Sequence, residues 1–315
     1  MSVTDFTAFT PQEGSTTVRV FVTGASGFIG RAVVAELVEA GHEVVGLARS
    51  TSSAAVVREL GARVRHGDLD DLDGLRAGAT EADGVIHLAN KHDWTDLAAS
   101  NRAERAAVHT LAEALAGSGR PLVLAAGVAG LGVGRTVTER DRNPAVGPDS
   151  PRGGAENLAL EYVGRGVRVS SARFAPTVHG EGDHGFVAVA AEAFRRRGSA
   201  AYPADGANRW PAVHRSDAAR LVRLGLEDAP AGTLLHAVAE QGVPVRDIVE
   251  ALAERLGLPA ESVSPEELAE AIPFVGGFLS ADVPTSSELT RDLLDWKPEG
   301  PTLLEDIAAG HYDRT

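Results

Sequence analysis

The feature that most constrains this fold is the segment Thr23-Gly24-Ala25-Ser26-Gly27-Phe28-Ile29-Gly30, which joins an apolar run to an amphipathic one. The run before it, Val18 to Val22, is typical of a buried strand, and the pattern from Ile29 to Val38 is typical of a helix. A strand that enters a helix through glycines brings backbone N–H groups and the positive end of the helix dipole close to an anion. The segment therefore predicts a cradle for the pyrophosphate of a nucleotide, in preference to a turn that only packs a helix on a sheet.

The rest of the first half alternates between strand-like and helix-like periods. Strand-like runs lie at 43–48, 63–66, 84–89, 121–126 and 166–172, and helix-like runs at 53–60, 97–116 and 152–165. This alternation predicts an α/β fold with a doubly wound parallel (Rossmann) sheet, covered by helices on both faces. The alternation loosens from residue 173. We therefore expect a flexible leader at 1–17, a dinucleotide-binding domain at 18–172 and mainly a smaller C-terminal substrate lobe at 173–315, partly interleaved with the first.

Composition excludes several classes of function. The 315 residues contain no cysteine, which rules out disulfides and thiolate chemistry and fits the reducing cytoplasm. A formal net charge of −14 argues against a nucleic-acid partner, because phosphate binding needs clustered positive charge. No apolar run is long enough to cross a bilayer, and the N-terminus lacks a signal pattern. We expect a cytoplasmic protein that binds a small molecule, without a membrane or nucleic-acid partner.

The ends of the second and third strands refine the nucleotide. After the second strand the chain offers Arg49 and Ser50, where a chain that prefers NAD(H) would place an acid for the ribose 2′-hydroxyl. A guanidinium pairs with a 2′-phosphate and hydroxyls donate to it, so NADP(H) is favoured over NAD(H). The alternative is that Arg49 is an ordinary exposed charge. After the third strand, Asp68 suits the adenine amino group and Leu69 suits the face of its ring.

Four segments together carry a family resemblance: residues 23–30, Gly67-Asp68-Leu69, Val85-Ile86-His87-Leu88-Ala89 and Leu293-Leu294-Asp295-Trp296-Lys297-Pro298. They resemble the extended short-chain dehydrogenase/reductase superfamily, often called NAD-dependent epimerases/dehydratases, over nearly the whole chain from about Val18. The resemblance implies a nicotinamide cofactor and, in dimers, pairing through the helices expected at 97–116 and 152–165; it leaves a homodimer open. The cofactor contacts that we expect are Gly24, Ser26, Gly27, Phe28, Ile29, Gly30, Arg49, Ser50, Asp68, Leu69, Leu88, Ala89, Asn90 and Pro176.

The sequence departs from that superfamily where proton transfer takes place. The superfamily uses a Ser or Thr after the fifth strand and a Tyr-x-x-x-Lys pair on the next helix. Here Gly127 stands at the serine position, Pro148 at the tyrosine position and Arg152 at the lysine position. Glycine and proline cannot transfer a proton, and an arginine stays protonated, although Arg152 could donate to the cofactor ribose or a phosphate. Arg152 is equally well explained as an ordinary residue at a helix start. The chain resembles an atypical subgroup that lacks the usual catalytic residues.

Two polar clusters at strand ends are candidates to replace those residues. After the fourth strand, His92 suits a general acid and Lys91 an oxyanion stabiliser. The alternative is a polar loop in which Asp93 caps the next helix. After the sixth strand, His179 is the second candidate for proton transfer. We expect no metal site in the glycine-rich loop that follows it.

Aromatic residues complete the expected site. Trp94, Phe186 and Trp210 would line an apolar cleft suited to a carbonyl-bearing or aromatic molecule, although they could equally belong to the core. Asp217 is expected to cap the helix that follows the strand near Trp210. The favoured function is an NADP(H)-dependent oxidoreductase acting on a carbonyl, imine or enone. The alternatives are a non-redox isomerase, lyase or cyclase that keeps the nucleotide fold, and an NADP(H)-sensing regulator without chemistry.

Overall fold

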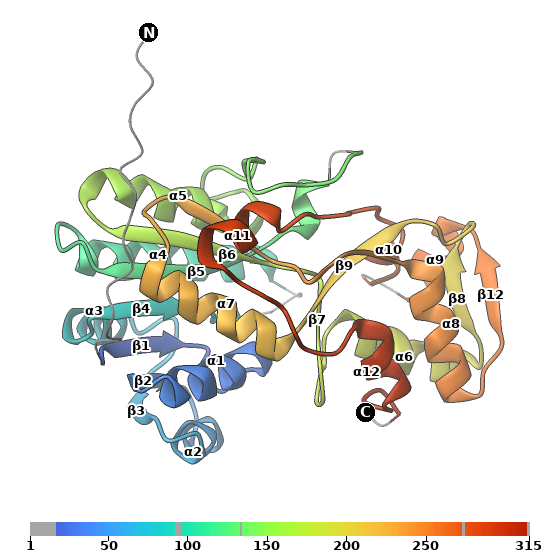
Figure 1. The fold of residues 1–315 in the computed structure, drawn as a ribbon, viewed down its shortest axis with the longest axis horizontal. Helices are drawn as coiled ribbons and strands as arrows, with labels where there is room; N and C mark the ends of the chain where they lie inside the picture. Colours follow the sequence, from blue (N-terminus) through green and yellow to red (C-terminus); the bar gives the residue numbers. More distant parts are fainter. Residues whose placement is uncertain (1–16, 92–95, 133, 273–274, 314–315) are drawn as a thin grey trace, which may run out of the picture.

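A seven-stranded parallel sheet forms the centre of the molecule (Figure 1). The computed structural model describes residues 17–91, 96–132, 134–272 and 275–313. The strands stand in the order β10-β6-β5-β4-β1-β2-β3. Their bounds are β1 Arg19–Thr23, β2 Glu43–Ala48, β3 Arg63–His66, β4 Gly84–His87, β5 Pro121–Gly127, β6 Arg168–Phe174 and β10 Thr233–Ala237. The doubly wound parallel sheet expected from the sequence is confirmed.

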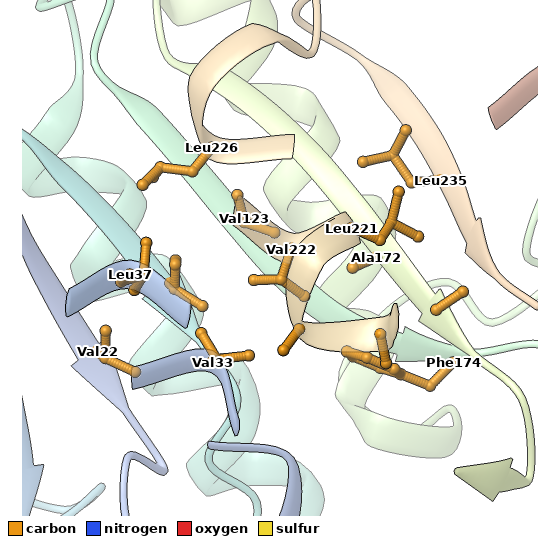
Figure 2. Close-up of a cluster of buried hydrophobic side chains, with 14 of the residues drawn as sticks. Val22, Val33, Leu37, Val123, Ala172, Phe174, Leu221, Val222, Leu226 and Leu235 are labelled. Atoms are coloured by element: carbon orange, nitrogen blue, oxygen red, sulfur yellow. The ribbon is translucent and has the colours of Figure 1, made fainter. Parts of the chain in front are cut away.

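Helices cover both faces of this sheet because successive strand residues point to opposite sides. Val20 and Val22 pack toward one group of helices and Phe21 toward the other. Figure 2 shows side chains of α1 and α7, among them Val33 and Val222, packed over the first of these faces. That face carries α1 Phe28–Glu39, α2 Thr51–Glu59 and α7 Arg215–Asp228, and the other carries α3 Leu72–Glu81, α4 Leu97–Leu115 and α5 Ala155–Glu161.

The strand order creates a crevice between β1 and β4. The chain builds β1, β2 and β3 in one direction and then crosses to β4, β5 and β6 on the other side. In open α/β sheets, ligands bind where this order reverses, beyond the carboxyl ends of the strands. Thr23 and His87, the last residues of β1 and β4, are register partners at that point. The fold therefore fixes where a nucleotide site would lie.

The remaining elements form a smaller group around a core that contains Phe194, Trp210 and Leu252. A three-stranded sheet has the order β11-β9-β7, and β12 pairs with β8. The strands are β7 Thr177–His179, β8 Ala200–Pro203, β9 Arg209–His214, β11 Glu240–Pro244 and β12 Ala260–Val263. The helices are α6 Phe186–Arg197, α8 Val245–Leu256, α9 Pro265–Ala271, α10 Val275–Leu279 and α12 Leu303–Ala308. The helix α11 Glu288–Leu294 packs instead on the large sheet, against β10 and α7. From this part of the chain, β10 joins the large sheet and α7 packs on its face. The domain boundary at 172/173 stays a prediction.

The structure differs from the sequence analysis at three local points. The helix expected at 152–165 is a 3₁₀ turn at Pro151–Gly154, the helix α5 and a second 3₁₀ turn at Tyr162–Arg165. Left-handed backbone at Gly153 and Gly154, with φ of 62° and 60°, prevents a continuous helix. The helix α3 was missed, and the N-cap of α4 is Asp96. Asp93, the cap in one of the two alternatives for this loop, lies outside the described residues. No helix in the described ranges has the length and apolar character that a membrane crossing needs.

Candidate active site

Three glycines shape the turn between β1 and α1, each for a different reason. Gly24 has φ 71°, and a Cβ atom there would lie 2.8 Å from the Ala89 nitrogen. Gly30 packs the helix on the turn, since a Cβ atom there would lie 2.0 Å from the Gly24 carbonyl oxygen. Gly27 is the exposed N-cap of α1 and brings no capping side chain. The first N–H groups of α1 are thereby left at the crevice between β1 and β4, where they suit a pyrophosphate.

The first turn of α1 keeps its positive character because it contains no acidic residue. The carbonyl oxygen of Ser26 accepts a hydrogen bond of 2.9 Å from Arg31 Nε. The ring centroids of the half-buried Phe28 and of His184 lie 5.8 Å apart in a T-shaped arrangement, and the Arg215 guanidinium carbon lies 5.5 Å from the Phe28 centroid. Ile29 is also half-buried. The turn is therefore packed against residues that follow β7 and β9.

The end of β2 offers one basic group without a structural role. Arg49 is exposed, and it has no hydrogen bond or ion pair with any residue that the structure describes. Ser50, by contrast, is the N-cap of α2, and its hydroxyl accepts a hydrogen bond of 3.1 Å from the Ser53 nitrogen. Local structure accounts for Ser50 and does not account for Arg49.

The end of β3 adjoins that of β2, because Ala48 and His66 are register partners. Asp68 is exposed, and its Oδ1 accepts hydrogen bonds from the nitrogens of Asp70 and Asp71 at 2.8 and 3.2 Å. Leu69 is only 7% exposed and packs in the core below. Most of its surface is therefore already in contact with protein, which limits what it offers to an adenine ring.

The residues after β4 line the same crevice. Leu88 and Ala89 are half-buried, and the Ala89 nitrogen donates to Thr23 Oγ1 at 3.3 Å. Lys91 Nζ makes an ion pair with Asp70, at 2.6 and 2.8 Å from its two oxygens. His92 and Trp94, predicted as a general acid and a pocket residue, lie outside the described residues. Lys91 thus sits at the predicted edge with its charge already paired.

A buried carboxylate on α4 holds two of the predicted site residues. Glu104 has a side chain only 1% exposed, and its Oε1 lies 2.5 Å from Nη2 of Arg152. Its other oxygen accepts a hydrogen bond from the Asn90 side chain. Sequence reasoning missed Glu104, although the signal was present: it shares the buried face of α4 with Ala107, Val108 and Leu111. An acid on an apolar helix face needs a partner.

His87 is a second residue that sequence reasoning did not single out. Its Nδ1 lies 2.8 Å from Thr23 Oγ1, and its Nε2 is buried without a hydrogen-bond partner among the described residues. Burial lowers the pKa of His87 to about 4, against the opposing effect of the Glu104 charge. His87 is therefore neutral near pH 7. The signal was a histidine in an otherwise apolar strand.

Gly127 and Pro148 occupy the positions of the superfamily's serine and tyrosine. Gly127 ends β5, and a Cβ atom there would meet only the Phe174 carbonyl oxygen, at 3.9 Å. Pro148 is exposed in the loop before α5. Tyr162 does not replace the missing tyrosine, because its buried hydroxyl bonds to His109 and Glu113 of α4, at 2.7 and 2.9 Å. The structure therefore leaves space at Gly127, and the glycine itself has no titratable side chain.

The second predicted cluster is mostly buried. Pro176 is half-buried just after β6, but His179 is fully buried, with its Nδ1 2.6 Å from Asp306 Oδ2. A side chain enclosed in this way has no surface for a substrate, so His179 is better explained as a residue that fixes α12 to β7. Among the described residues, no group of three or more histidines and acids is placed to hold a metal ion.

Two predicted substrate residues belong to the core of the smaller group. Trp210 is 1% exposed, and its Nε1 donates to the Phe278 carbonyl oxygen at 3.1 Å. Phe186 is half-buried against Trp210 and Phe278, with ring centroids 5.7 and 5.2 Å away. Trp210 is therefore a packing residue of this core, where its size and apolar character stabilise the smaller group. The helix α7 is capped by His214, and Asp217 instead accepts from the nitrogens of Glu299 and Gly300.

Comparisons with known proteins identify the family of this chain. Residues 20–236 match the model of the NAD dependent epimerase/dehydratase family. An uncharacterised protein of Schizosaccharomyces pombe is 44% identical over 296 residues, which cover 94% of this chain and 100% of that protein. The 2′-dehydrokanamycin reductase of Streptomyces kanamyceticus is 31% identical over 264 residues, 79% of this chain and 69% of that enzyme.

A solved structure shows the same fold. A dTDP-glucose 4,6-dehydratase from Streptomyces venezuelae, with NAD bound, superposes with a TM-score of 0.72 at 21% identity and covers 92% of this chain and 96% of that one. The two proteins therefore share the same arrangement of sheet and helices. From the family match, the length of the shared sequence and the glycine turn, the chain belongs to the NAD-dependent epimerase/dehydratase family.

Proposed function

We propose that this protein is an NADP(H)-dependent oxidoreductase that acts on a carbonyl, imine or enone group of a small molecule. The observation that carries the cofactor assignment is Arg49, an exposed cation at the end of β2 with no partner in the described structure. It stands where the glycine turn and the ends of β2 and β3 meet the adenosine half of a dinucleotide. A 2′-phosphate would give this charge a partner.

The chain's own residues fit the rest of such a cofactor. The open N-terminus of α1 at Gly27 donates to the pyrophosphate, and Asp68 keeps an oxygen for the adenine amino group. We expect Pro176 and the residues after β4, which are half-buried, to contact the nicotinamide. When bound, the nicotinamide supplies or accepts a hydride. A relative named as a reductase supports the redox assignment.

The preference for NADP(H) is tested by removing the Arg49 charge. We expect Arg49→Ala to weaken NADPH binding about 10- to 100-fold, because a hydrogen bond to a charged group contributes about 1.5–3 kcal/mol. NADH affinity should change less than about twofold. Arg58→Ala is the matched control, since it removes an exposed cation from the other end of α2. Fluorescence titration gives all Kd values; equal losses for NADPH and NADH would refute the 2′-phosphate assignment.

The absence of a titratable side chain at Gly127 and Pro148 favours one alternative, a non-redox enzyme that keeps the cofactor bound. A library of carbonyl, imine and enone compounds separates the two functions. A redox enzyme consumes NADPH stoichiometrically with product, which is followed by absorbance at about 340 nm, the reduced nicotinamide band. Product formation without any loss of NADPH would assign the alternative. With the substrate found in this way, the same assay compares the turnover of the wild type with that of His92→Ala.

A further inference from the structure

The backbone around Arg152 is held in an uncommon conformation by α4. Arg152 has φ 53°, a left-handed value that side-chain-bearing residues rarely adopt. Arg105 Nη1 donates to the Gly153 carbonyl oxygen at 2.8 Å, and a Cβ atom at Gly153 would lie 2.4 Å from the Asn101 carbonyl oxygen. Such strain persists only where the surroundings fix it, and it gathers at functional sites. The ion pair between Arg152 and Glu104 also holds this segment against α4.

The Glu104–Arg152 pair is half buried and half open. The Glu104 side chain is 1% exposed, whereas that of Arg152 is 40% exposed. The buried carboxylate receives only two side-chain donors in the described structure, Arg152 and Asn90. Asn90 follows β4, so the pair lies at the carboxyl edge of the sheet where the glycine turn also lies. Glu104 therefore fixes the guanidinium while leaving N–H groups of Arg152 accessible for a ligand.

A fixed guanidinium serves one kind of reaction better than another. It donates hydrogen bonds to an oxyanion but does not release its proton. Hydride addition to a carbonyl carbon leaves a strongly basic alkoxide, which calls for a proton donor such as the missing tyrosine. Addition to the far carbon of a conjugated carbonyl leaves a delocalised enolate, which needs only hydrogen-bond donors at its oxygen. The residues at Gly127, Pro148 and Arg152 match the second case.

We propose that Arg152, oriented by Glu104, is the oxyanion-binding residue of this site and that the substrate is an α,β-unsaturated ketone or aldehyde. This inference rests on the proposed redox function. Hydride from NADPH forms the new C–H bond at the β-carbon, the carbon–carbon π pair moves to the bond between the α-carbon and the carbonyl carbon, and the carbonyl π pair moves to oxygen. Water then protonates the α-carbon. The products are the saturated carbonyl compound, NADP⁺ and hydroxide.

A non-reacting oxyanion tests the binding role directly. The probe is 4-nitrophenolate, a planar delocalised oxyanion, and the matched neutral probe is 4-nitroanisole; both are titrated by difference absorbance with NADP⁺ present. We expect Arg152→Met to weaken 4-nitrophenolate binding about tenfold or more, Glu104→Gln to weaken it less, and neither to change 4-nitroanisole binding. Equal 4-nitrophenolate affinity in wild type and Arg152→Met would overturn the proposal. Arg152→Lys keeps the charge and serves as the folded comparison if the methionine variant does not fold.

Steady-state kinetics then test the substrate class. With NADPH, the wild-type protein should turn over enones and enals and leave the matched saturated ketones unchanged. Arg152→Met should lower kcat about 100-fold or more with a smaller change in KM, as expected for a group that stabilises a developing charge. Turnover of saturated ketones but not enones would contradict the inference while leaving the redox function intact. NADPH titration of each variant separates both results from failure of the cofactor site.

Discussion

Two segments at the carboxyl edge of the same sheet, the glycine turn after β1 and the region from Gly127 to Glu156, are held in place by different groups. The turn after β1 contains glycines whose neighbours lie so close that a side chain would not fit. The groups that it offers to a ligand are backbone N–H groups. The region from Gly127 to Glu156 has no tyrosine or lysine, and side chains hold it: Arg152 on Glu104, and Glu156 on Arg173. The comparison teaches that the sheet order decides where a ligand binds, whereas side chains at single positions decide which reaction takes place.

The glycine turn should respond most strongly to a single methyl group. Gly30→Ala places a Cβ atom 2.0 Å from the Gly24 carbonyl oxygen, so α1 must shift away from the turn. We expect NADPH affinity to fall by about 100-fold or more and the free energy of unfolding to fall by about 1–3 kcal/mol. Gly164→Ala is the control, because a Cβ atom there meets nothing within 4 Å. Titration and urea unfolding should show that only the first variant is impaired.

The region around α5 should respond through its buried charges. Arg173 is fully buried and its Nε lies 2.7 Å from Glu156 Oε1. Removing one partner leaves an uncompensated buried charge, so Arg173→Met should cost about 3–5 kcal/mol of unfolding free energy. Arg76→Met removes an arginine from an exposed pair with Asp73 and should cost less than about 1 kcal/mol. Comparable losses in both variants, measured by urea unfolding, would show that the buried pair has no special role.

The same pair gives a pH dependence with a defined sign. Burial raises the pKa of Glu156, but hydrogen bonds from Arg173, Ser171 and Asn143 outweigh it, and the pKa ends below its usual value. This contribution to stability is present above the unfolded-state pKa of about 4.3 and is lost as the pH falls through the folded value. Unfolding free energies from pH 6 to 3 should therefore fall more steeply in the wild type than in Arg173→Met. Parallel curves would contradict the assignment.

His87 lies between these two segments, at the end of β4, and should give a smaller change in unfolding free energy at a milder pH. Its folded pKa of about 4 is below the unfolded value of about 6.5, so its stabilising contribution is complete above pH 6.5 and is lost as the pH falls toward 4. We expect the wild type to lose about 2–3 kcal/mol more than His87→Asn between pH 7 and 4.5. An NMR titration that placed the His87 pKa near 6.5 would contradict this account of its burial.

The Lys91–Asp70 ion pair should give the smallest effect. Both side chains are partly exposed, at 32% and 65%, and exposed pairs contribute about 1 kcal/mol or less. Lys91→Ala should therefore change the unfolding free energy by less than about 1 kcal/mol, and the change should diminish in high salt. A larger effect on turnover than on stability would restore Lys91 as a participant in the reaction. Urea unfolding at two salt concentrations, together with NADPH consumption, measures both.

The sequence predicted the parallel sheet and the glycine turn because these depend on local patterns, although the expected ends of β4 and β6 differ from the observed ones by two residues. Glycine spacing and period-2 runs are set by consecutive residues, so the glycine turn after the first strand could be predicted, whereas the strand order that places the crevice between β1 and β4 could not. The buried contacts could not be predicted in the same way. Glu104 and Arg152 are 48 residues apart, and a sequence read one segment at a time gives no sign that they meet.

The aromatic residues show a second limit of prediction from local sequence. A tryptophan near a strand end has the same local pattern whether it lines a pocket or fills a core, and Trp210 fills the core because β9 turns it toward Phe186 and Phe278. His179 was misjudged for the same reason, since Asp306 approaches it from 127 residues away. Exposure decides between binding and packing, and exposure is set by tertiary contacts.

A crystal structure with NADPH tests the central claim most directly. The account predicts the pyrophosphate at the N-terminus of α1 beside Gly27, the 2′-phosphate within hydrogen-bond distance of Arg49, and the nicotinamide on the side of the crevice that carries Arg152 and Asn90. A cofactor whose 2′-phosphate points away from Arg49, or crystals that bind no NADPH at concentrations that saturate related enzymes, would contradict it.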